Sequence, residues 1–89
     1  MTNNETPAYV CSHVFNRTRP VLLVSRDDGD WQLLCGEPHE AEERPRVVGL
    51  NHLVANDPTL NVILNLPPDW EAERASQSEQ WVQRRIPAP

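Results

Sequence analysis

The fold is decided by residues 21–35, which read VLLVSRDDGDWQLLC. Two apolar runs, 21–24 and 31–35, flank a polar segment in this stretch. Asp28 and Gly29 fit the central positions of a type I′ turn, where both residues need a positive φ angle. An Asp-Gly pair between apolar runs is a strong hairpin signal, and a longer loop centred on it is compatible with the same pattern. The stretch therefore predicts two neighbouring antiparallel strands.

The segment before the hairpin predicts a third strand. Residues 9–15 read YVCSHVF, which is rich in β-branched and aromatic side chains. Because side chains alternate across a strand, Cys11 and His13 would share one of its faces. We expect this strand to lie beside the hairpin and to complete a three-stranded antiparallel meander.

A surface loop and a first short helix are predicted after the hairpin. Residues 37–46 are polar and acidic and contain two prolines, which favours a loop. Leu50, Leu53 and Val54 then lie at the i, i+3, i+4 spacing of a buried helical stripe. This spacing predicts a helix over 47–55.

A second short helix is predicted over 58–65. Asp57 can cap its first turn, and the proline that follows suits the first helical position. We expect this helix to bury three side chains, Leu60, Ile63 and Leu64.

The last segment, residues 69–85, is compatible with both a helix and strands. It contains good helix formers, yet side chains alternate around Trp70 and around Trp81 on either side of a polar Ser/Gln turn. We favour a final strand near 81–85.

These elements together predict an α+β fold, an antiparallel three- to four-stranded β-meander packed with two short helices. The chain has 89 residues, which suits one domain. We expect a disordered lead-in over residues 1–8, a single domain over 9–86 and a flexible tail over 87–89.

The charge of the chain restricts its partners. Its formal net charge is −5, and all eight cationic side chains are arginine. An acidic domain is repelled by phosphate backbones and by anionic lipids, so we expect neither nucleic-acid nor membrane binding. No apolar run is long enough to span a membrane, and the N-terminal residues lack a secretory signal. These features predict a cytoplasmic protein with reduced thiols.

Two cysteines and two histidines are candidate metal ligands. Cys11 and His13 belong to the first predicted strand, while Cys35 ends the hairpin and His39 follows four residues later. Two thiolates and two imidazoles can complete a tetrahedral zinc site, although these spacings are not those of common zinc knuckles. The commoner role of such cysteines is as small buried core residues. A disulfide between them is a third interpretation.

The sequence contains no P-loop, HExxH, GxSxG or Rossmann fingerprint. A cysteine enzyme needs a base within hydrogen-bond reach of the thiol. On a strand, His13 would lie about two residue rises, roughly 6.6 Å, from Cys11, and nothing in the sequence places His52 nearer. We therefore expect a non-enzymatic protein whose only candidate cofactor is zinc.

The acidic segment offers a surface for a protein partner. Glu37, Glu40, Glu42 and Glu43 could dock on a basic protein, although such runs are more often simply solvated. Trp70 is a candidate aromatic anchor, since Trp is enriched at binding hot spots. These residues predict a protein partner. We expect the chain itself to be a monomer or a weak dimer.

Three stretches of the chain carry a family resemblance, namely CSHV at 11–14, RPVLLV through DGDWQLLCG at 19–36, and VVGLNHL, DPTL and LPPDWEAER within 47–74. In this order they resemble a family of small bacterial proteins of unknown function that looks related to immunity proteins of polymorphic toxin systems. The resemblance implies an α+β fold and a protein-binding role, in which the chain masks a toxin's active site without chemistry of its own. It implies no catalytic residue.

Overall fold

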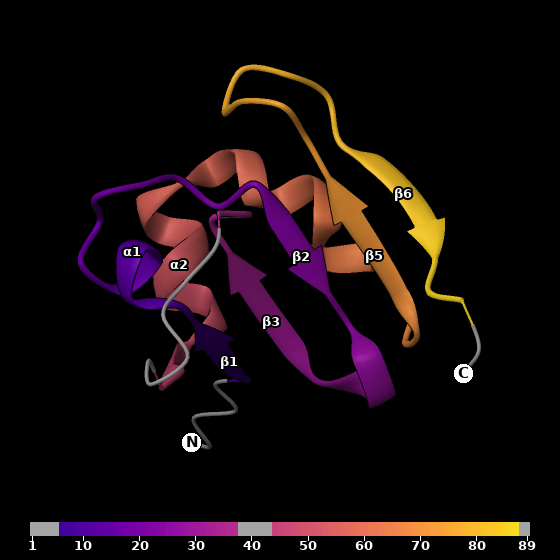
Figure 1. Ribbon diagram of the computed structural model, residues 1–89, viewed down its shortest axis with the longest axis horizontal. Coiled ribbons are helices and arrows are strands. Elements are labelled where there is room, and N and C mark those ends of the chain that lie inside the picture. Colours follow the sequence, from indigo (N-terminus) through magenta and orange to yellow (C-terminus); the bar gives the residue numbers. More distant parts are fainter. Residues whose placement is uncertain (1–5, 38–43, 88–89) are drawn as a thin grey trace.

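The protein is an α+β fold in which helical segments cover one face of a six-stranded sheet (Figure 1). The computed structural model describes residues 6–37 and 44–87. The strands are β1 (Pro7–Val10), β2 (Leu23–Ser25), β3 (Trp31–Leu34), β4 (Arg46–Gly49), β5 (Trp70–Glu73) and β6 (Val82–Arg85). The covering helical segments are α1 (Ser12–Phe15), α2 (Leu50–Asn56) and η2 (Pro58–Asn65).

The predicted hairpin is confirmed, because β2 and β3 pair as antiparallel neighbours. Its turn contains one short 3₁₀ segment, η1 (Asp27–Gly29), with Asp28 at φ 58° and ψ 23° and Gly29 at φ 85°. The Asp30 amide donates to the Asp27 carbonyl over 3.1 Å. Asp28 and Gly29 are thus the central pair of a turn in which both residues have the positive φ that was predicted.

The strand predicted over 9–15 is wrong in its extent and in its pairing. The observed strand β1 begins at Pro7. The lead-in predicted over 1–8 therefore extends too far, because Pro7 and Ala8 belong to this strand. β1 ends at Val10, and it runs parallel to β3 rather than antiparallel. In the sheet it therefore lies on the far side of β3 from β2, which a meander does not allow.

The residues after β1 form one helical turn instead of continuing the strand. In α1 the Phe15 amide donates to the Cys11 carbonyl over 2.9 Å. Val10, Cys11 and Val14 are all buried. Two consecutive buried residues followed by a third three positions later fit the end of a strand and one turn of helix, and do not fit strict alternation.

The first predicted helix begins three residues later than expected. Residues 47–49 belong to β4, which pairs antiparallel with β1 at the sheet edge. The β-branched Val47 and Val48 favour an extended backbone over a helix. The stripe on α2 is confirmed, since Leu50 is buried and Leu53 packs against the core.

The second predicted helix is confirmed in position, with a tighter period. The Asp57 carboxylate accepts a hydrogen bond from the Thr59 amide over 3.1 Å, as the predicted cap requires. η2 is a 3₁₀ helix, whose period of three places Leu60 and Ile63 on one buried line. Leu64, predicted to be buried, is 37% exposed because it lies off that line.

The final strand near 81–85 is confirmed as β6, and it pairs antiparallel with β5. The strand order is β4-β1-β3-β2-β5-β6, so the sheet is mixed and larger than the predicted three- to four-stranded meander. Burial alternates along the strands: Ala8 and Val10 are fully buried, whereas Tyr9 between them is 39% exposed. Among the described residues, the helical segments therefore cover only one of the two sheet faces.

Among the described residues, the most buried charged side chain is that of Arg74, which follows β5 and is 4% exposed. Its Nε and Nη2 atoms donate to the Val21 carbonyl over 3.1 and 2.9 Å. Nη2 also pairs with the Asp57 carboxylate at 3.2 Å, and the guanidinium lies 4.2 Å from the centre of the Trp81 ring. Arg74 therefore ties β5 to the start of the hairpin and to the cap of η2.

The pKa of Asp57 reflects this environment. Burial by itself raises the pKa of a carboxyl group, but the hydrogen bonds from Thr59 and the charge of Arg74 act more strongly in the other direction. The pKa of Asp57 is accordingly below its ordinary value of 3.8. A lowered carboxyl pKa stabilises the fold above the unfolded-state pKa, and that contribution is lost as the pH falls through the folded-state pKa.

We expect Arg74→Ala to lower the free energy of unfolding by about 3 kcal/mol, because it leaves the Val21 carbonyl without its side-chain donors and the partly buried Asp57 carboxylate without its counter-charge. Urea unfolding followed by Trp fluorescence measures the loss. Arg84→Ala is the matched control, since Arg84 pairs with Glu71 and Glu73 on the surface and such pairs contribute little. Equal losses in both variants would contradict the role given to Arg74.

We expect Asp57→Asn to be less stable than the wild type at pH 7 and to lose less stability on acidification. The amide still caps η2, but it carries no charge that protonation can remove. Urea midpoints at pH 7, 5 and 3 test this, and the wild type should lose its extra stability below about pH 4. Parallel pH profiles for the two proteins would show that the Asp57 carboxylate does not contribute.

Candidate metal centre

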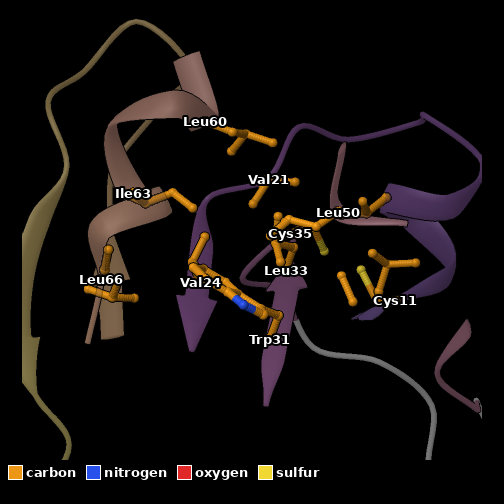
Figure 2. Close-up of a cluster of buried hydrophobic side chains, with 14 residues drawn as sticks. Cys11, Val21, Val24, Trp31, Leu33, Cys35, Leu50, Leu60, Ile63 and Leu66 are labelled. Atoms are coloured by element: carbon orange, nitrogen blue, oxygen red, sulfur yellow. The ribbon is translucent and has the colours of Figure 1, made fainter. Parts of the chain in front are cut away.

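Two cysteines and one histidine meet at one end of the buried core. Cys11 precedes α1, His13 lies in α1, and Cys35 directly follows β3. The His13 Nδ1 atom lies 3.3 Å from the Cys35 Sγ atom. One ligand atom from each of the three residues lies within 4.8 Å of the other two. Figure 2 shows the two sulfur atoms as neighbours at this end of the cluster.

The parallel pairing of β1 with β3 explains why the thiols meet. Val10 is paired with Leu33 in this register, so Cys11 and Cys35 both lie just beyond the same end of the strand pair. The helical turn after β1 then brings His13 over Cys35. The residues of this cluster were predicted, but their predicted arrangement was wrong. Cys11 and His13 do not share a face of one long strand, because the strand ends at Val10 and His13 lies in α1.

Both cysteines are buried, with Cys11 4% and Cys35 1% exposed, and no disulfide joins them. Burial raises the pKa of the Cys35 thiol, and the neighbouring Cys11 raises it further. A backbone hydrogen bond at Glu37 and the charge of Arg19 act in the opposite direction without cancelling the rise. Cys35 therefore lacks the exposure and the lowered pKa that activate a cysteine nucleophile, even though an imidazole lies within reach.

The donor atoms suit a metal ion that prefers sulfur and nitrogen. Bonds of about 2.3 Å to sulfur and 2.0 Å to nitrogen, at tetrahedral angles, place ligand atoms roughly 3.5–3.8 Å apart. The 3.3 Å between the His13 Nδ1 and Cys35 Sγ atoms is just below that range, and all three ligand atoms lie within 4.8 Å of one another. His39, the fourth predicted ligand, lies outside the described residues.

Of the five predicted partner-binding residues, the structure describes only Glu37 and Trp70. Glu37 is exposed, whereas Glu40, Glu42 and Glu43 lie outside the described residues. Trp70 is half-buried and packs against the core on the helical side of the sheet, so little of its ring is available as an anchor. No helix in the described ranges has the length and apolar character needed to cross a bilayer.

A pocket of about 510 Å³ is the feature that the sequence analysis missed. It lies between α1, the loop that follows it, α2 and the start of η2, and its lining includes His52. The residues around it come from three separate parts of the chain, within 10–21, within 48–60 and at Gln77. No local sequence pattern marks such a site, because its walls meet only after the sheet and helices have packed.

Comparison with protein-family models, with curated proteins and with solved structures found no match to this chain. The resemblance to immunity-like proteins therefore stays a prediction.

Proposed function

We propose that this protein binds a zinc ion through Cys11, His13 and Cys35. The observation that supports the proposal is the convergence of two sulfur atoms and an imidazole nitrogen within 4.8 Å of one another. Thiolate and imidazole donors favour zinc over the hard cations that prefer oxygen. A fourth ligand completes the tetrahedron, either a water molecule or His39, which the sequence predicts for this role.

The role of such a site is structural. Its ligands come from the start of α1 and from the end of β3, so a bound ion cross-links the N-terminal segment to the centre of the sheet. The small core of an 89-residue domain provides modest stability, and a metal cross-link adds to it directly. Zinc also needs deprotonated thiols, so its binding competes with the proton that the raised pKa retains on Cys35.

Protein purified without chelator should contain about one zinc ion per chain when measured by mass spectrometry of the metal. Cobalt substitution should give thiolate-to-metal charge-transfer absorption and the intense visible bands of a tetrahedral ion. Zinc at a hundredfold excess over its dissociation constant stabilises the folded state by about 2.7 kcal/mol, which should raise the melting temperature by roughly 11–22 °C.

Cys35→Ser and His13→Ala should lose the metal and the thermal shift. His52→Ala is the matched control, because this histidine lies on α2 outside the cluster and its loss should leave the zinc content unchanged. Wild-type protein that neither contains zinc nor takes it up under reducing conditions would contradict the proposal. The two thiols would then be core side chains only.

A second candidate function is the non-enzymatic protein-binding module that the family resemblance implies. The observation that favours it is the sheet face turned away from the helical segments. That face carries Tyr9 at 39%, Val47 at 58% and Val82 at 61% exposure. Tyr9 and Val47 are directly paired across β1 and β4, so their side chains form one apolar patch on a sheet face.

We expect Tyr9→Ser combined with Val47→Ser to weaken binding to the toxin-like product of a neighbouring gene at least tenfold, since apolar anchors dominate interface energy. Titration calorimetry measures the affinity. Val62→Ser is the control, because Val62 is 61% exposed on η2 and lies off the proposed surface. Equal affinities for the double variant and the wild type would remove this face from the interface.

A further inference from the structure

The 510 Å³ pocket has the size and composition of a small-molecule site. Ligand pockets commonly measure about 300–1,000 Å³ and combine an apolar interior with a few polar groups. Buried side chains on its lining are Val10, Val14, Val21 and Leu60, with exposures of 0 to 6%. They supply an apolar interior that a hydrocarbon or aromatic body can fill.

Two arginines from the loop after α1 supply positive charge to the pocket. Arg17 and Arg19 both line it, and both are exposed. Across residues 6–37 and 44–87, neither forms an ion pair with a carboxylate. On a chain with a net charge of −5, Arg17 and Arg19, which have no acidic partner among the described residues, supply local positive charge that is complementary to an anion.

The backbone at Arg17 is a second, independent observation. The Thr18 amide donates to the His13 carbonyl over 2.9 Å, and the Arg17 amide donates to the Val14 carbonyl over 3.1 Å. This is the hydrogen-bond pattern of a Schellman motif, whose left-handed residue is usually glycine. Arg17 occupies that position with φ 61°. A long cationic side chain therefore stands where the backbone conformation favours glycine.

Asp57 restricts the charge of the ligand. Asp57 also lines the pocket, and its carboxylate accepts hydrogen bonds from Thr59 and Arg74. A ligand must therefore place its anionic group on the Arg17 and Arg19 side and keep it away from Asp57. A single negative charge meets this condition better than a doubly charged phosphate does.

We propose that this pocket binds a small monocarboxylate with an apolar body. The carboxylate accepts hydrogen bonds from the guanidinium groups of Arg17 and Arg19, and the apolar body enters the interior lined by Val14 and Leu60. The site is separate from the zinc cluster: it uses the Val14 side of α1, whereas the cluster uses His13.

Octanoate is the probe, with octylamine and 1-octanol as isosteric cationic and neutral controls, each titrated into the full chain by calorimetry. We expect octanoate to bind at one site and both controls to bind at least tenfold more weakly. A hydrogen bond to a charged group increases the affinity by a factor of about ten or more. The titrations are run with zinc and with chelator. Octanoate binding that persists with chelator separates this proposal from the proposed metal site.

Arg17→Gly is the informative variant, because glycine suits the left-handed position and the fold should be at least as stable. It should nevertheless bind octanoate about tenfold more weakly, as should Arg19→Ala. Arg84→Ala, which removes an arginine on the uncovered sheet face, should bind as the wild type does. Equal binding of the three probes, no binding of octanoate, or unchanged affinity in Arg17→Gly would each overturn the proposal.

Discussion

The guanidinium of Arg74 donates hydrogen bonds to acceptors in three segments of the chain, namely Val21 before β2, Asp57 and Thr59 at the start of η2, and Gln77 after β5. Burying a charge is costly unless hydrogen bonds and an opposite charge compensate it, so these segments must meet in one arrangement. Three of the four acceptors, Val21, Asp57 and Gln77, also line the pocket. The same side chain that fixes η2 against the sheet therefore fixes one wall of the proposed ligand site.

The single turn of α1 separates the two proposed sites. His13 faces the thiols, whereas Val14 and Phe15 face the pocket, because neighbouring side chains on a helix point in different directions. Arg19 connects the two electrostatically, since it lines the pocket and its charge acts on the Cys35 thiol. The four residues of α1 thus contribute to two chemically different sites. One consists of sulfur and nitrogen donors, and the other of apolar side chains with arginines at its rim.

The uncovered face of the sheet is built differently from the covered one. Arg84 on β6 bridges Glu71 and Glu73 on β5, and all four residues of β6 are exposed. Charged side chains on an edge strand oppose pairing with another sheet, so this edge is protected while the apolar pair on β1 and β4 stays accessible. A partner is therefore more readily accommodated against the face at Tyr9 and Val47 than along the edge at β6.

Some features of this fold could be predicted because their causes lie within a few residues. The Asp28-Gly29 turn follows from the positive φ angles that these residues tolerate, and the Asp57 cap follows from its hydrogen bond to the Thr59 amide two residues away. The chemistry of the cysteine and histidine side chains was likewise readable from residue type. Only the tertiary structure decided that β1 pairs parallel to β3, that the two thiols lie together and that a pocket forms beside α1. These outcomes depend on which distant segments bury their apolar side chains against one another, and local sequence does not distinguish a parallel from an antiparallel neighbour.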